Sequence, residues 1–572
     1  MARQKGSIDS PFVVADAPTL ADVIAMLDQD SGQSETQRRD QKSALRRLAE
    51  LIGRAPEMIP ANINWLHVRL RRTHPRLHGI SKKTFSNLKS AALKALERTG
   101  CSRKRSDWQR RPNAEWADLL DSVANKHDRW RLSQFAQFCS AIDIGPREVS
   151  DTHLLGMRTA LIEESFVDKP EHIAANAVKT WNRLRSERRD WPDIGLAQPP
   201  KKREPWTYPL DQFPTSFQAD VAQWVDRLRN PDLFDDTGPP KPLRETTIQH
   251  RLFQIRQMAS AIVRSGTPIS VITDLAALVD LDNLKAGLRW MMARFNNKPT
   301  EAIHGLSAGL LAIARHHVRA EECQIRAIQG IVKRLNHGFD GLREKNRIRL
   351  LQLEDPHNLA KLLHLPSTLE QKSRQLRIKK LRKAALLLQA ALAIEILLFA
   401  PMRIGNLACL HLERHLRPIK SRRDQRTLIH IPAEEVKNAR ALDFELGPVT
   451  TRLLERYLRE ARPVLLDAPS GYLFPAGNGE PKRTDALSRL ISSSIRDHAG
   501  LDINAHLFRS IAGKIHSLAA PGDFATLSHV IGDSLQTAMS AYAQFERRTA
   551  IEHFQKSVEA ARTAAPHTWR RT

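Results

Sequence analysis

The sequence predicts a mainly α-helical, multidomain protein, in which helical N-terminal modules precede a mixed α/β domain that is mostly helical with a small antiparallel sheet. At 572 residues the chain is too long for one hydrophobic core, and it corresponds to roughly three or four domains. Apolar residues recur at helical spacing in one segment after another. Only one stretch, in the C-terminal region, has the alternation of a β-hairpin.

Three basic joints, the first two of which contain proline, interrupt the helical pattern and divide the chain. These joints are residues 102–112, 198–205 and 343–349. We therefore expect helical modules at residues 1–105, 106–200 and 201–345, followed by a C-terminal domain at residues 346–572. No fixed period relates the three modules, so the sequence does not predict a repeat protein.

Helices within the modules place apolar residues beside a basic face. The clearest are residues 42–52, 81–93 and 243–262. The basic faces are candidate contacts with a DNA backbone, and the alternative is that they are ordinary solvated helix surfaces. We favour DNA contact because the faces recur in all three modules of a strongly basic chain.

The overall charge is the most unusual bulk property of the chain. Lysine and arginine number 89 against 63 aspartate and glutamate residues, which gives a formal net charge of +26. Such an excess favours a polyanionic partner, with nucleic acid first and an acidic membrane surface second. A hydrophobic content of 41% still allows well-formed cores.

Cysteine usage and hydropathy favour a cytoplasmic protein without a membrane partner, and we expect it to be nucleoid-associated and of bacterial type. The four cysteines are far apart and form no CxxC pair, so we expect neither a zinc site nor a disulfide framework. No secretion signal begins the sequence. The most apolar stretch, residues 384–402, contains Gln389 and Glu395, which favours a buried helix over a membrane span.

The C-terminal region combines this buried helix with the predicted hairpin. Residues 427–432 and 441–446 read as two strands, and the polar turn between them carries Lys437 and Arg440. Helical patterns follow at residues 449–463, 484–498, 507–518, 523–532 and 535–556.

Five residues in this region have the chemistry needed to transfer a phosphodiester: Arg403, Lys437, His506, Arg509 and Tyr542. Tyrosine supplies a nucleophile. Arginine grips two phosphate oxygens with its planar fork, and lysine or histidine can protonate a leaving oxygen. Each residue also has an ordinary structural reading, and Arg440 is a rival for the role of Lys437. The other tyrosines, Tyr208, Tyr457 and Tyr472, do not follow the His-x-x-Arg pattern as Tyr542 does.

This order of residues resembles the tyrosine recombinase (phage integrase) family. Residues 399–410 look like the first arginine motif of the family, residues 505–510 like the second, and residues 532–542 like its final block. The resemblance covers about residues 350–550. Residues 209–340 resemble the family's helical core-binding domain in style only, and the first 200 residues match nothing specific.

The resemblance implies a role for each matching residue. Tyr542 would attack the phosphate and become joined to the DNA 3′ end, leaving a free 5′ hydroxyl. Arg403 and Arg509 would clamp the phosphate, Lys437 would protonate the leaving oxygen, and His506 would hydrogen-bond the phosphate or assist proton transfer. Because the covalent bond stores the energy of the phosphodiester, no metal or nucleotide cofactor is expected.

The resemblance also implies partners and a biological setting. The expected substrate is double-stranded DNA carrying attachment sites, bound by a homo-tetramer, with other recombinase subunits as further candidates. Residues 544–572 are suited to pack on a neighbouring subunit. The expected activity is integration or transposition of a mobile element.

Two positions depart from the family pattern. Asp533 stands where the family usually has histidine or tryptophan, and a carboxylate there would repel a phosphate unless it pairs with an arginine or stays protonated. His529 could substitute for the missing donor if one continuous helix places it on the face of Asp533. Asn406 stands where the family usually has an acidic residue. These departures support one alternative, a weak or inactive DNA-binding partner subunit of a recombinase complex. A further alternative is a DNA-binding regulator without phosphate chemistry.

Overall fold

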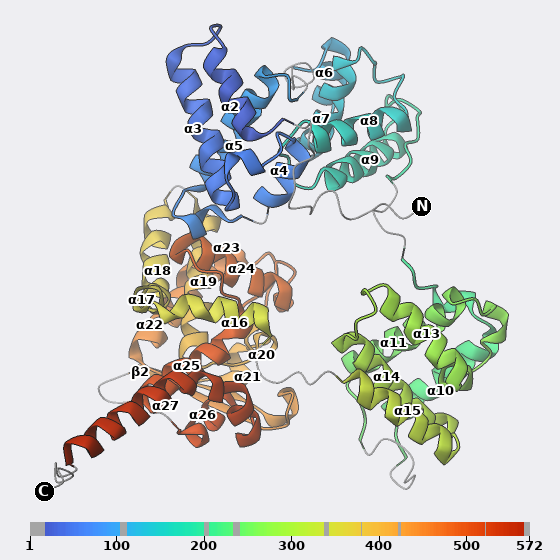
Figure 1. Cartoon of the computed structure of the whole chain (residues 1–572), viewed down its shortest axis with the longest axis vertical. Coiled ribbons are helices and arrows are strands. Elements are labelled where there is room, and N and C mark those ends of the chain that lie inside the picture. The colour runs from blue at the N-terminus through green and yellow to red at the C-terminus, as the bar shows by residue number, and fades with distance from the viewer. Residues whose placement is uncertain are drawn as a thin grey trace, which may run out of the picture. The chain divides into compact units, whose positions relative to one another are not determined.

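The computed structural model describes residues 18–71, 73–102, 111–199, 205–232, 241–336, 343–378, 380–420, 425–520 and 522–564. Within these ranges the side chains of residues 420, 540–550, 552 and 553 are not described. The chain divides into two compact units, one formed by residues Met1–Pro200 together with Gly341–Thr572 and the other by residues Lys201–Asp340. The described part is mostly helical with one small sheet, as the sequence predicts (Figure 1).

The first N-terminal module is a four-helix arrangement. Its helices are α2 (Leu20–Gln29), α3 (Glu35–Ile52), α4 (Ile63–Leu70) and α5 (Lys82–Arg98). Each begins at a residue whose side-chain oxygen accepts a hydrogen bond from the first turn: Thr19, Ser34, Asn62 and Ser81. These caps satisfy backbone donors that a helix start leaves unpaired. The apolar faces of the helices then pack into one buried cluster.

The second module also consists of four helices, and its core is rich in aromatic residues. Its helices are α6 (Ala114–Asp121), α7 (Lys126–Ala141), α8 (Asp151–Glu163) and α9 (Pro170–Glu187). Trp116, Phe135 and Trp181 are fully buried and pack against one another. The indole N–H groups of Trp116 and Trp181 donate to backbone carbonyls, which removes the cost of burying them.

The unit of residues Lys201–Asp340 is entirely helical in its described part. Its longer helices are α10 (Thr215–Arg229), α11 (Glu245–Arg264), α13 (Leu281–Ala293), α14 (Glu301–Ile313) and α15 (Glu322–Leu335). They enclose a separate hydrophobic core. The described part of this unit therefore has its own folded centre.

The C-terminal region is built around α19 (Leu381–Phe399). Almost every residue from Ala384 to Leu397 is buried, which confirms the buried helix. Around it lie α16 (Glu344–Leu351), α17 (Pro356–Leu363), α18 (Leu365–Leu376), α20 (Ile404–Ala408), α22 (Pro448–Arg456), α24 (Thr484–Ala499) and α25 (Phe508–Ala519). No helix in the described ranges combines the length and apolar character needed to cross a bilayer.

The sheet of this region has three antiparallel strands in the order β1-β2-β3. The strands are β1 (Leu416–Lys420), β2 (Gln425–Ile431) and β3 (Leu442–Leu446), with Ile429 opposite Leu416 and Phe444. The predicted hairpin is β2–β3, and its buried residues alternate as expected. The sequence did not predict β1, because this short strand contains Pro418, a residue that sheets accept only at an edge.

One predicted joint is wrong. Residues 343–349 were expected to link two domains, but residues 344–351 form helix α16. Two of its arginines form ion pairs, Arg347 with Glu344 in the same helix and Arg349 with the distant residue Asp502. Leu350 is buried in the C-terminal core. The other two joints, at 102–112 and 198–205, lie largely outside the described residues.

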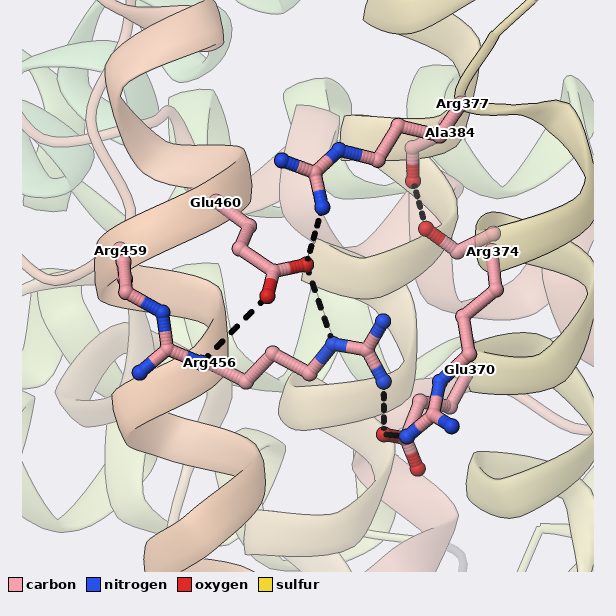
Figure 2. Close-up of polar contacts among 8 residues, drawn as sticks. Glu370, Arg374, Arg377, Ala384, Arg456, Arg459 and Glu460 are labelled. Carbon is pink, nitrogen blue, oxygen red and sulfur yellow. Dashed lines mark hydrogen bonds and ion pairs between the residues drawn. The ribbon is translucent and has the colours of Figure 1, made fainter.

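A network of ion pairs braces α18 against the end of α22 and the π-helical turn η9 (Tyr457–Ala461). Figure 2 shows Arg456 between two carboxylates, with Nη1 2.6 Å from Glu370 Oε1 and Nε 3.1 Å from Glu460 Oε2. Arg377 and Arg459 also reach Glu460. The network joins elements that pack on α19.

Candidate active site

Arg403 comes directly after the buried helix α19. The chain leaves α19 through Ala400 and Pro401, and Arg403 occupies the N-cap position of α20 with extended backbone angles. Buried neighbours Met402 and Ile404 anchor it. Its side chain is 31% exposed, so a core helix delivers this cation to the surface.

Arg509 lies in the first turn of α25, after the short 3-10 turn η10 (Ala505–Leu507). Leu507 and Phe508 are buried and fix the start of the helix. Arg509 Nη1 donates to the carbonyl oxygen of Ile531 at 2.6 Å. Its side chain is 11% exposed, so its orientation is set by the surrounding structure.

Asp533 connects the two arginines. Arg403 Nη2 donates to Asp533 Oδ1 at 2.9 Å, and Arg509 Nη2 donates to Asp533 Oδ2. The Asp533 side chain is only 10% exposed. Two arginines that are far apart in the sequence therefore converge on the two oxygens of a single carboxylate, and the expected pairing of Asp533 with an arginine is found twice over.

The chain reaches Asp533 through a sharp turn at Gly532. Helix α26 (Phe524–Ile531) ends there, since Gly532 has a φ of 63° in the left-handed region. A Cβ at this glycine would meet the end of the Leu442 side chain, and the left-handed conformation itself favours glycine. His529 was expected to substitute for the missing donor only if one continuous helix placed it on the face of Asp533. Because α26 ends at Ile531, no such helix carries both residues.

The loop between β2 and β3 closes over the same turn. Asn438 accepts from Arg403 Nη1 at 3.2 Å and donates through Nδ2 to the carbonyl oxygen of Gly532. Arg440 Nη1 donates to the carbonyl oxygen of Asp533 at 3.4 Å. Between them Ala439 has a φ of 50°, which is uncommon for a residue with a side chain. The hairpin loop, both arginines and the Gly532–Asp533 connection thus form one network.

Asn438 is a residue that sequence reasoning missed. The only signal for it was its place in a short polar turn, where asparagine tolerates unusual backbone angles. That signal predicts a turn and gives no hint of the contact with Arg403. Lys437, next to it, is exposed on the same loop. None of the hydrogen bonds or ion pairs found among the described side chains involves Lys437.

The two histidine candidates are both at the surface. His506 is exposed on η10, three residues before Arg509, and His529 is exposed in the last turn of α26. Asn406 is half-buried on α20, and its Nδ2 is buried without a hydrogen-bond partner in the described part of the chain. Asn406 stands where the family usually has an acid, three residues after Arg403. Its side-chain amide donor has no hydrogen-bond partner in the described part of the chain.

Tyr542 lies on the long helix α27 (Leu535–Ala564), and its side chain falls outside the described residues. In Figure 1 the first part of α27 lies beside α25 and α26, and the helix then extends away from them. Two of the other tyrosines are packed against the cores of their units. Tyr457 is fully buried, donates to the carbonyl oxygen of Leu473 and has its pKa raised by burial. Tyr208 packs in the separate helical unit beneath Arg264.

The electrostatic character of the network follows from its composition. Arg403, Arg440 and Arg509 donate to the Gly532–Asp533 connection, and Asp533 supplies the one carboxylate that these contacts include. A cluster with more guanidinium groups than carboxylates keeps a net positive charge and favours an anion. No group of three or more His, Cys, Asp or Glu side chains suited to a metal ion occurs among the described residues.

Comparison with known proteins finds similarity only among solved structures. No protein-family profile matches the chain, and no curated protein matches its sequence. A lambda integrase dimer bound to a COC′ core site aligns at 14% identity over 57% of this chain and 94% of that chain, with a TM-score of 0.30. XerH site-specific recombinase bound to difH substrate aligns at 15% identity over 64% of this chain and 100% of that chain, also with a TM-score of 0.30.

A third solved structure is the Tn1549 transposon integrase in complex with a circular intermediate DNA. It aligns at 14% identity over 57% of this chain and 99% of that chain, with a TM-score of 0.33. The chain is thus similar, at low identity, to integrases and recombinases of the family that its motifs resemble. At these values the likeness concerns the fold and carries nothing about activity.

Proposed function

We propose that the chain is a site-specific DNA recombinase or integrase that cuts and rejoins DNA through a 3′-phosphotyrosine intermediate. The observation that carries the proposal is the convergence of Arg403 and Arg509 on one anionic group. Two guanidinium groups held in this way can bind the two non-bridging oxygens of a phosphodiester and stabilise the charge that develops there.

The proposed reaction uses the chain's own side chains throughout. Tyr542 gives its phenolic proton to His506 as its oxygen attacks phosphorus, the bond from phosphorus to the 5′ oxygen breaks, and Lys437 donates a proton to that leaving oxygen. The DNA 3′ end is then joined to Tyr542. Attack by a 5′ hydroxyl on this intermediate reverses the step and rejoins the strands, so that no external energy source is consumed.

DNA binding is assigned to the remaining modules and to the charge of the chain. Residues 201–345 would act as a core-binding domain, and residues 1–105 and 106–200 would contact further DNA with their basic faces. Residues 346–572 would form the catalytic domain and act in a tetramer on two duplexes. Because such binding releases counterions, affinity should fall steeply as salt rises.

A second candidate is a weak or inactive partner subunit of a recombinase complex. Asp533 and Asn406 favour it, since the first places a negative charge between the two arginines and the second has a buried donor without a partner in the described part of the chain. The two candidates differ in whether a covalent bond to DNA forms.

The test is a suicide-substrate assay on the full chain. The protein is incubated with a pool of nicked duplexes that have a randomised central segment, and covalent complexes are separated on a denaturing gel. The proposal predicts an adduct that Tyr542→Phe abolishes and that Tyr472→Phe, a matched change at a half-buried tyrosine, leaves in place.

Two results would contradict the proposal. An adduct that survives Tyr542→Phe would remove Tyr542 from the role of nucleophile. No adduct from a pool that the protein demonstrably binds and enriches would favour the inactive partner subunit.

A further inference from the structure

The carboxylate of Asp533 has the shape and charge of the ligand that the two arginines are suited to bind. A carboxylate and a phosphodiester each present two oxygens that share one negative charge. Asp533 places one oxygen on Arg403 Nη2 and the other on Arg509 Nη2. The position that a bound phosphate would take is therefore filled by a side chain of the protein itself.

We propose that Asp533 is an internal competitor for the anion site, and that it must leave the two arginines before a phosphodiester can bind there. The identity of the ligand as a phosphodiester rests on the proposed function, whereas the competition itself rests on the contacts of Asp533. In the conformation described here the site is closed to an external anion.

The donors left on the arginines explain why Asp533 and a phosphate exclude each other. Arg403 Nη1 already donates to Asn438, and Arg509 Nη1 already donates to the carbonyl oxygen of Ile531. The Nη2 groups are the donors that converge on one place, and Asp533 uses both. A phosphate brought to the remaining donors would also lie beside an almost buried carboxylate, and like charges at such distances repel.

The connection that carries Asp533 touches the main core at one described point, where Gly532 packs against the side chain of Leu442. It joins α26 to α27, and these helices share a small apolar cluster whose buried residues are Leu527 and Ile531 of α26 and Ala538 of α27. Its polar contacts to the rest of the domain come largely from the hairpin loop, where Asn438 and Arg440 bind the backbone carbonyls of Gly532 and Asp533. A short segment with so small a core of its own can move while most of the main core of the domain stays in place, with Leu442 the main-core residue that has to adjust.

The same movement would reposition the nucleophile. Ser534, the next residue, caps α27 by accepting from the backbone N–H of Thr537 at 3.2 Å, and α27 carries Tyr542. Release of Asp533 from the arginines therefore shifts the start of the helix that bears the proposed nucleophile. Opening of the anion site and delivery of the tyrosine become one event.

The test measures binding of inorganic phosphate to the full chain by isothermal titration calorimetry. Asp533→Asn removes the charge and keeps the shape, so we expect phosphate affinity to rise by about tenfold or more, since the competent site is no longer occupied. Asp443→Asn is the matched control, because it makes the same charge change on β3, where Asp443 is 60% exposed and pairs with His430. This control should bind phosphate as the wild type does.

A double variant tests whether the bound phosphate contacts Arg509. Adding Arg509→Lys to Asp533→Asn should abolish the gain, because lysine cannot supply the two-pronged contact. If Asp533→Asn does not fold, Asp533→Ser serves in its place, with folding checked by circular dichroism. An affinity for phosphate that is unchanged or weaker in the folded variant would overturn the proposal.

The outcome is independent of the proposed activity. Stronger phosphate binding by Asp533→Asn, with no DNA adduct from either protein on a pool that both bind and enrich, would support the competitor and contradict the recombinase function. Unchanged phosphate binding together with a Tyr542-dependent adduct would contradict the competitor and leave the recombinase function standing.

Discussion

Two arginine–carboxylate networks in the C-terminal region use the same chemistry on different supports. In the first, Glu370 on α18 and Glu460 on the π-helical turn η9 hold Arg456 between them (Figure 2). Their helices pack on α19 at the centre of the large core. In the second, Asp533 holds Arg403 and Arg509 from a connection between two helices that rests on a small cluster.

The comparison indicates that the function of an ion pair depends on whether its carboxylate lies on a helix of the main core or on a short connection between helices. Carboxylates on helices of the main core can only brace, because moving them would disrupt buried packing. A carboxylate on a short connection can be exchanged for another anion at little cost to the core. We therefore expect changes in the first network to alter stability and changes in the second to alter anion binding and chemistry.

The largest expected effect is on covalent adduct formation. Arg403→Lys and Arg509→Lys should each lower the rate of adduct formation by roughly 100-fold to 1,000-fold, because lysine retains the charge and loses the fork that aligns two phosphate oxygens. Arg456→Lys should leave the rate unchanged. Gel quantification of the adduct over time measures the rates. Equal losses in all three variants would contradict the proposed difference between the two networks.

The next effect is on stability. Arg456→Ala should lower the free energy of unfolding by about 2 kcal/mol, since it leaves two largely buried carboxylates without their shared partner. Arg459→Ala is the control in the same network, and as its side chain is 70% exposed, we expect a change within about 0.5 kcal/mol. Urea unfolding followed by circular dichroism checks both. A larger loss from Arg459→Ala would mean that the outer arginines provide the brace.

A smaller effect links the second network to its ligand. Asp533→Asn leaves two guanidinium groups facing each other without a carboxylate, so its melting temperature should fall in phosphate-free buffer. Phosphate at ten times its dissociation constant should restore about 1.4 kcal/mol, since ligand binding stabilises the folded state by mass action. A thermal melt with and without phosphate measures this. Equal phosphate responses in Asp533→Asn and Asp443→Asn would exclude a specific site.

The smallest effect concerns a buried carboxylate that has no arginine. Burial raises the pKa of Glu395 above the ordinary value of 4.5, although a hydrogen bond from Thr450 opposes the shift. The folded state therefore holds this proton more tightly, and the resulting stabilisation is complete below pH 4.5 and is lost as pH rises through the raised pKa. Burial also acts to raise the pKa of Glu460, but the hydrogen bond from Arg456 and the nearby arginine charges lower it overall.

Glu395→Gln isolates that contribution. The variant keeps the shape and a partner for Thr450 and removes the titration, so its stability relative to wild type should increase as pH rises above 4.5. Unfolding curves across this range provide the measurement. A constant difference between the two proteins at every pH would show that Glu395 does not titrate in this window.

The sequence predicted the elements whose signals are local. Helical spacing located α19 and α25, and alternation located the β2–β3 hairpin. Strand β1 was not predicted because it is short and contains Pro418. Helix α16 was mistaken for a joint because its many basic residues are typical of a linker, although Arg347 pairs with Glu344 within the helix. Such pairs along a helix are visible in sequence only when the helix is already assumed.

The candidate site was predictable in three of its charged residues but not in Asn438 or in its contacts. Arg403, Arg509 and Asp533 could each be named from motif order. Their convergence depends on the turn at Gly532 and on Asn438 reaching across from the hairpin, and both are products of tertiary packing. Spacing along the chain cannot report that a carboxylate in the position of a family histidine lies between two arginines.

Peptide mapping of the covalent complex tests the central claim most directly. Trypsin cleavage after Lys514 and Arg547 releases a peptide whose one tyrosine is Tyr542. Mass spectrometry of the complex formed on the nicked duplex pool should find this peptide carrying a nucleotide through a 3′-phosphotyrosine bond. A nucleotide attached to any other residue, or a complex that contains only the unmodified peptide, would contradict the account.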